Sequence, residues 1–237
     1  MNRTLRLLPL FLLATCLSAA TKIRSYQMGL DIKPDGTATA TATLTLDTCV
    51  PGTLVVPVGF ASVTGLKVDN APAGVRLDPA PKAVRLQLPE GVAPACTVTF
   101  SFPVAKAYKD APKGNTGEKP LAAANRVLAF ALVNTQETAI DAFRLDVRLP
   151  EGMMVQTIRE QLPKLGKTEA GPRVRLNKVD GRQGGFLQLS PMAQGDSTAL
   201  TLELTPTRKS PLWLLVGLLL GGLYLFFFRD LVAAKAA

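Results

Sequence analysis

Much of the excess positive charge in this chain lies in one stretch, between positions 159 and 182. This basic run consists of Arg159, Lys164, Lys167, Arg173, Arg175, Lys178 and Arg182. Such a surface favours an anionic envelope polymer, an anionic lipid or an acidic protein as its ligand. No aromatic side chain interleaves with these charges, so the stretch lacks the stacking platform that single-stranded nucleic acid needs, and we expect no nucleic-acid partner. A solvated basic hairpin without a ligand is the alternative.

Carboxylates are the second group of side chains that could do chemistry, because two of them can hydrolyse a glycosidic bond. The candidates are Asp31, Asp47, Glu90, Asp141, Asp146, Glu151 and Glu203. They alternate outward on predicted strands or lie in turns, and no spacing makes two of them converge. We interpret them as solvated surface charges and expect no catalytic residue.

The absence of histidine narrows the chemistry further. The sequence contains no histidine, which excludes Ser-His-Asp and Cys-His catalysis, histidine-ligated zinc and an imidazole general base. Three cysteines are too few for a four-thiolate zinc site or iron–sulfur cluster. No glycine-rich phosphate loop is present either. We therefore expect neither a metal nor a cofactor.

Two cysteines, Cys49 and Cys96, lie in the region that we expect to be exported. An even pair in an oxidising compartment predicts one disulfide that closes a loop in the first half of the chain. Two buried free thiols are the alternative.

The elements that must position these side chains are mostly strands. Apolar residues alternate with polar ones from Tyr26 to Ile32, and again from Ala38 to Leu46 after a Pro-Asp-Gly turn, which predicts a β-hairpin. Further strands are predicted at 54–58, 63–68, 84–88, 96–102, 127–133, 143–149, 174–176, 186–189 and 200–204, with a single helix as an alternative around 155–163. This pattern predicts an all-β fold of two immunoglobulin-like β-sandwich modules, 21–105 and 126–206, joined by a linker or long loop at 106–125.

Both ends of the chain carry apolar segments. Residues 1–20 combine Arg3 and Arg6, a short apolar centre and a Ser-Ala-Ala cleavage pattern, which predicts a signal peptide; an uncleaved anchor or a lipidated Cys16 are alternatives. Residues 211–228 include an uncharged apolar run and predict a transmembrane helix, followed by a cytoplasmic tail at 229–237. We expect a single-pass protein of the bacterial cytoplasmic membrane with its N-terminal domain outside.

Two glycines within the predicted span, Gly217 and Gly221, stand four residues apart. They would give the helix one small face that another helix can approach closely. This spacing favours self-association or an integral-membrane partner. Glycine is also frequent in membrane helices without any such role.

Two stretches of the sequence resemble a bacterial family of predicted membrane proteins of unknown function. They are IRSYQMGLDIKPDGTATATATLTL at 23–46 and FALVNTQETAIDAFRLDVRLPEG at 130–152. The first resembles a Tyr-led strand, an Asp-Gly turn and a second strand after a signal peptide. The second resembles a block in which an asparagine precedes an alternating strand, although this chain lacks the aromatic residues usual around that asparagine. The resemblance implies an exported β ectodomain tethered to a membrane and supplies no catalytic residue.

These observations together predict a non-enzymatic protein of the bacterial envelope. We expect an accessory subunit of a membrane complex or a binding module for another envelope molecule. A glycan-active hydrolase that uses two carboxylates is the enzymatic alternative. A structural spacer or adhesin, suggested by the threonine-rich strand from Thr37 to Thr45, is the third.

Overall fold

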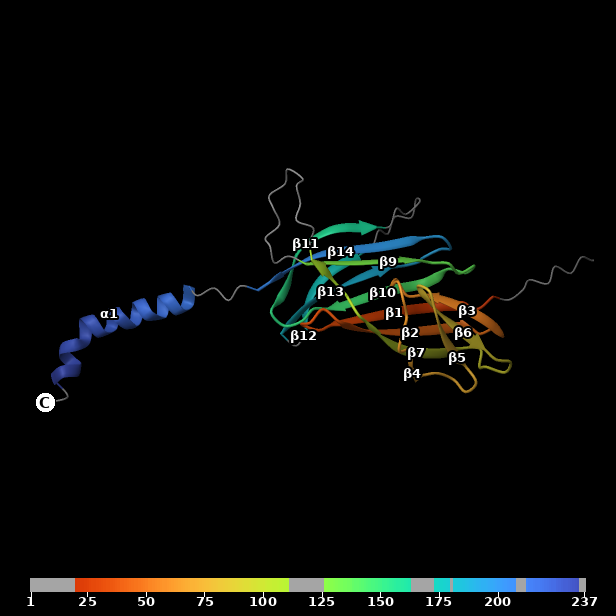
Figure 1. Ribbon diagram of the computed structural model, residues 1–237, viewed down its shortest axis with the longest axis horizontal. Helices are drawn as coiled ribbons and strands as arrows, with labels where there is room; N and C mark the ends of the chain where they lie inside the picture. The colour runs from red at the N-terminus through yellow and green to blue at the C-terminus, as the bar shows by residue number, and fades with distance from the viewer. Residues whose placement is uncertain (1–19, 111–125, 163–172, 180, 208–211, 235–237) are drawn as a thin grey trace, which may run out of the picture.

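The computed structural model describes residues 20–110, 126–162, 173–179, 181–207 and 212–234 (Figure 1). Within these ranges the chain forms strands β1 to β14 and a C-terminal helix, α1 (Leu212–Ala234). The strands make three sheets, and the largest of them positions the candidate site.

The largest sheet contains seven strands in the order β12-β13-β10-β1-β2-β7-β4. Their bounds are β12 (Arg173–Val179), β13 (Arg182–Leu189), β10 (Ile140–Arg148), β1 (Lys22–Ile32), β2 (Ala38–Thr48), β7 (Cys96–Val104) and β4 (Lys67–Asn70). All neighbouring pairs are antiparallel except β1 and β10, which run parallel.

Two smaller sheets accompany it. One has four strands, β11 (Met153–Leu162), β14 (Ser197–Pro206), β9 (Arg126–Val133) and β8 (Lys109–Asp110). The other has three strands, β3 (Gly52–Pro57), β6 (Ala83–Leu88) and β5 (Arg76–Ala80).

Both smaller sheets pack on the same face of the seven-stranded sheet. Tyr26 on β1 and Phe143 on β10 are opposite each other in the parallel register and point to that face. The ring of Phe143 stacks on Phe130 of β9, with centroids 6.4 Å apart. The Tyr26 hydroxyl donates a 2.7 Å hydrogen bond to the carbonyl oxygen of Pro57 in β3. The core therefore lies on one side of the large sheet, and polar side chains of β1, β2 and β10 lie on the other.

The alternation of apolar and polar residues along each strand explains why one face of the large sheet is buried and the other is polar. Tyr26, Met28, Leu30 and Ile32 of β1 are all between 0% and 1% exposed, whereas Gln27 and Asp31 between them are exposed. Successive residues of a strand point to opposite faces, so one strand supplies both the core and the polar surface.

The prediction of two separate sandwich modules was wrong. Strand β1 belongs to the first predicted module and β10 to the second, yet the two strands are neighbours in one sheet. Phe130 from the second module also contacts Phe60 from the first, with ring centroids 5.7 Å apart. The alternation of apolar and polar residues shows which face of a strand is buried, but it does not show which strand lies beside it. The alternation therefore could not reveal that both predicted modules contribute strands to one sheet.

Three further differences concern single segments. Residues 153–162 form strand β11 and not a helix, and its register with β14 shifts twice, between Val155 and Thr157 and between Ile158 and Glu160. Strand β5 was not predicted. It contains Pro79, which is typical only of edge strands, and its short sequence has no clear alternation of apolar and polar residues. Of the predicted linker at 106–125, Ala107 and Tyr108 are buried, and 111–125 lie outside the described residues.

The prediction of a membrane span at 211–228 also requires correction. Helix α1 begins at Leu212, but no helix in the described part of the chain is both long and apolar enough to cross a membrane. Gly217 and Gly221 lie on this helix, and a Cβ atom built on either would meet no described atom within 4 Å.

The remaining predictions about the ends of the chain fall mostly outside the described residues. The predicted signal peptide at 1–20 lies there apart from Ala20, as do Cys16 and the last three residues of the predicted tail. Nothing in the structure supports the signal peptide. The cellular location stays a prediction.

Candidate functional site

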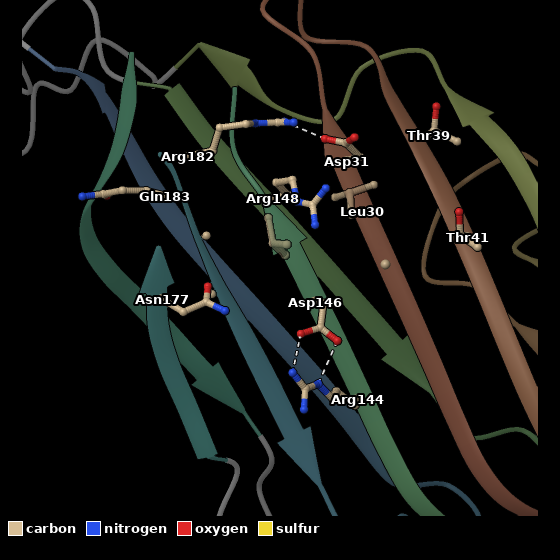
Figure 2. Close-up of a pocket in the computed structure, with 14 residues that line it drawn as sticks. Leu30, Asp31, Thr39, Thr41, Arg144, Asp146, Arg148, Asn177, Arg182 and Gln183 are labelled. Atoms are coloured by element: carbon tan, nitrogen blue, oxygen red, sulfur yellow. Dashed lines mark hydrogen bonds and ion pairs between the residues drawn. The ribbon is translucent and has the colours of Figure 1, made fainter. Parts of the chain in front are cut away.

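The polar face of the seven-stranded sheet carries a groove of about 640 Å³ (Figure 2). We call it the sheet groove. It is lined by Gly29, Leu30, Asp31, Thr39, Thr41, Arg144, Asp146, Val147, Arg148, Asn177, Arg182, Gln183, Gly184 and Gly185. These residues come from β1, β2, β10, β12 and β13. The groove is therefore lined by strands of both predicted modules.

Strand register brings these residues together. Asp31 on β1 lies between Thr39 of β2 and Arg148 of β10. Arg148 in turn lies opposite Gly184 of β13, and Gly184 lies opposite Asn177 of β12. One row of residues therefore runs across five strands, with a guanidinium at its centre.

An ion pair closes one end of the groove. The guanidinium of Arg182 donates a 2.6 Å bond from Nη2 to Oδ1 of Asp31. The same nitrogen donates to the carbonyl oxygen of Ile32 at 3.0 Å, and Nε donates to that of Leu149 at 2.7 Å. These contacts hold Arg182 in place and occupy three of its five N–H donors.

A second ion pair lies further along β10. Arg144 and Asp146 form a bidentate contact in which both N···O distances are 2.8 Å. Arg144 also lies over the ring of Phe186, 4.4 Å from its centroid, which is a cation–π arrangement. The hydrogen bonds that the Arg144 guanidinium donates to the Asp146 carboxylate raise the pKa of Arg144 above its ordinary value.

The third arginine differs from the other two. Arg148 is exposed, and among the residues that the structure describes it has no hydrogen bond and no ion pair. Figure 2 shows it between the Asp31–Arg182 pair and the Arg144–Asp146 pair. It is therefore the groove arginine whose five N–H donors are all available to a ligand.

Two glycines without side chains, Gly184 and Gly29, leave space in the groove. A Cβ atom on Gly184 would lie 2.4 Å from the carbonyl oxygen of Val147 and 3.2 Å from Oδ1 of Asn177, so no larger residue fits beside Arg148. A Cβ atom on Gly29 would meet only the carbonyl oxygen of Thr41, at 3.9 Å. The space above Gly29 is therefore open to a ligand.

The basic run predicted from sequence reaches this site only in part. Arg182 lines the groove, and Arg175 lies on the same face, opposite Phe186. Lys178 is exposed on β12 and lies opposite Gln183. Lys164 and Lys167, together with the side chains of Arg159 and Arg173, lie outside the described residues.

Sequence reasoning missed the two arginines of β10. Their signal was present, because Arg144, Asp146 and Arg148 occupy the outward positions of a strand that was correctly located. Three charged residues on one face of one strand could have indicated a site. What the sequence lacked was the register that places Asp31 and Arg182 next to them.

The candidate carboxylates separate into two groups. Asp31 and Asp146 line the groove, each in an ion pair with arginine. Of the others, Asp141 pairs with Lys22 at 3.1 Å and Asp47 with Arg24 at 3.9 Å, while Glu203 is buried on β14. No group of three or more residues that could ligate a metal occurs in the described ranges.

The predicted disulfide between Cys49 and Cys96 was wrong. Both residues are free thiols, with their Sγ atoms 3.0 Å apart, well beyond the about 2.05 Å of a disulfide bond. Register places Cys96 opposite Leu46 at the end of β2 and so brings the thiols close without a bond. Burial, together with the neighbouring Cys96 thiol, raises the pKa of Cys49 to about 12.

We therefore expect Cys49 to be alkylated slowly in the folded protein. With a pKa of about 12, the thiolate fraction and the rate with iodoacetamide should rise about tenfold per pH unit from pH 7 to 10, without a plateau. Peptide mass spectrometry of samples quenched over time measures this rate. The urea-unfolded chain is the control, and its rate should level off near pH 9. A plateau near pH 9 in the folded protein would contradict the prediction.

No protein-family model matches this sequence, and no curated protein matches it. Several solved structures share part of its arrangement. A protein from Parabacteroides distasonis ATCC 8503 with a provisional assignment as a protease has a TM-score of 0.45 and 9% identity, over 77% of this chain and 40% of that one. Native leukotriene A4 hydrolase from Saccharomyces cerevisiae gives 0.41 and 11%, over 76% and 29%. An M1 zinc metallopeptidase from Deinococcus radiodurans gives 0.39 and 14%, over 78% and 42%.

This chain matches less than half the length of each of those structures. At these TM-scores the likeness says nothing about activity. A zinc peptidase site of the His-Glu-x-x-His type requires two histidines, and this sequence has none.

Proposed function

We propose that this chain is a non-enzymatic binding module whose sheet groove holds the anionic group of a ligand. The observation that carries the proposal is Arg148, an exposed arginine with no partner among the described residues, set between two ion pairs. A guanidinium presents a planar fork of donors that matches a carboxylate or phosphate in bidentate geometry. The proposal retains the expectation that the ligand belongs to the bacterial envelope.

The two ion pairs support this role by making the groove rigid. Arg182 is held by three hydrogen bonds, and Arg144 by a bidentate carboxylate and an aromatic ring. A site whose walls are already fixed loses little conformational entropy when a ligand enters. The same pairs disfavour the hydrolase alternative, because both groove carboxylates already accept hydrogen bonds from arginine.

Replacing Arg148 with glutamine tests the proposal. Titration of the full chain with sodium glucuronate at constant ionic strength, followed by NMR chemical shifts, should show binding that the variant weakens about 10- to 100-fold. This factor corresponds to the about 1.5–3 kcal/mol of a hydrogen bond to a charged group.

The matched control is Arg85→Gln. Arg85 is an exposed arginine on β6 of the three-stranded sheet, away from the groove. The control should bind like the unmodified chain. Equal affinity of the Arg148 variant and the unmodified chain would contradict the proposal, and so would an equal loss in both variants.

A further inference from the structure

We infer that the ligand of the sheet groove is an acidic sugar, a unit with one carboxylate and several hydroxyl groups, such as a uronic acid within a glycan. This inference rests on the proposed function and specifies its ligand. It follows from the charge of the groove, from its hydrogen-bonding groups and from its place on the sheet.

The charges of the groove suit a ligand with a single negative charge. Its charged lining residues are three arginines and two aspartates, which leaves one positive charge in excess. Asp31 and Asp146 would repel the additional charges of a polyphosphate or polysulfate. A monocarboxylate placed on Arg148 meets the one unpaired cation of the described groove and stays between the two aspartates.

The aspartates are explained if the ligand also donates hydrogen bonds. An ionised carboxylate has about four lone-pair positions, so Asp31 and Asp146 can accept further bonds besides those from arginine. Simple anions bring no donors and gain nothing from these groups. Sugar hydroxyls both donate and accept, and would find the hydroxyls of Thr39 and Thr41 and the amide of Asn177 in the same groove (Figure 2).

The position of the groove argues against a peptide as the ligand. Extended peptides usually bind a sheet at an edge, where unpaired backbone groups extend the ladder. The groove lies instead on the face of β1 and β10, whose backbones are paired on both sides. The volume of about 640 Å³ falls within the about 300–1,000 Å³ typical of small-molecule sites.

Gly29→Val provides a test that leaves every charge in place. The open space above Gly29 lets a β-branched side chain enter the groove, and valine favours the strand conformation. We expect the variant to unfold at the same temperature as the unmodified chain or above it, and to lose at least tenfold in affinity for glucuronate. Gln27→Val is the control, since Gln27 is exposed on the same face of β1 but does not line the groove.

The probes are glucuronate, neutral glucose, propionate and tetraglutamate, each titrated into the full chain. Glucuronate should bind at least tenfold more tightly than the other three, and both Gly29→Val and Arg148→Gln should weaken its binding. If propionate binds as tightly and Arg148→Gln abolishes both, the acidic-sugar inference fails while the proposed anion site stands. Tighter binding of tetraglutamate would also overturn the inference. Absence of binding by every probe would overturn both.

Discussion

An alanine at position 59 is expected to lower the free energy of unfolding by about 2–5 kcal/mol. Gly59 has a φ angle of 71°, in the left-handed region, which costs a residue with a Cβ atom about 1–2 kcal/mol. The added Cβ would also lie 2.5 Å from Cε2 of Phe130 and 2.9 Å from the carbonyl oxygen of Ala131. Overpacking of this kind costs about 1–3 kcal/mol more.

The expected effect is large because of what Phe130 contacts. Its ring lies between Phe60, at 5.7 Å, and Phe143, at 6.4 Å. Displacing it would disturb the packing of β9 on the seven-stranded sheet and the contact with the segment that follows β3.

Urea denaturation of Gly59→Ala and Gly91→Ala separates the two contributions. Gly91 has a φ angle of 82°, and a Cβ atom there would meet nothing within 4 Å. The Gly91 variant should therefore show only the backbone contribution of about 1–2 kcal/mol. Equal losses in the two variants would contradict the predicted clash with Phe130.

Replacing Asn134 with alanine is expected to destabilise the protein by about 2–4 kcal/mol. Asn134 is 0% exposed, and its Nδ2 donates to the carbonyl oxygens of Met192 at 3.0 Å and Thr138 at 3.2 Å. Its Oδ1 accepts a 3.0 Å bond from the backbone N–H of Gln136. Alanine would remove the side-chain partners of the Thr138 carbonyl oxygen and the Gln136 N–H, at about 1–3 kcal/mol for each group that water cannot reach, whereas the Met192 carbonyl oxygen keeps its bond from the backbone N–H of Ile140.

Thermal unfolding and urea denaturation check this value against Asn177→Ala. Asn177 is exposed on β12, and its replacement should change the free energy of unfolding by less than about 0.5 kcal/mol. If the Asn134 variant were as stable as the Asn177 variant, its hydrogen bonds would not hold the loop after β9.

The sequence predicted the strands best where one face is buried along a whole element. The β1–β2 hairpin lies where the alternation of Tyr26 to Ile32 and Ala38 to Leu46 places it. Strand β11 was misinterpreted, because two register shifts against β14 break the period of two that identifies a strand. The alternation of residues therefore predicted strands correctly where the register with the neighbouring strand is regular, and did not where the register shifts.

The site could be predicted less well than the strands. Arg182 belonged to the predicted basic run, whereas Arg148 was not identified. The role proposed for Arg148 depends on its position beside Asp31 and Gly184. These two residues lie next to Arg148 only because of the order of strands in the sheet. Strand order is set by packing between segments far apart in the sequence, and no local pattern encodes it.

The parallel pairing of β1 with β10 also has a consequence for how the protein folds. Strand β1 can pair with β2 through a short turn, but its other edge must wait for β10, since Ile23 pairs with Ile140. Contacts between such distant residues close long loops, and proteins rich in them fold slowly. Until β10 arrives, β1 presents an unpaired edge that another chain could join. The interval before β10 docks is therefore when this protein is most prone to aggregate.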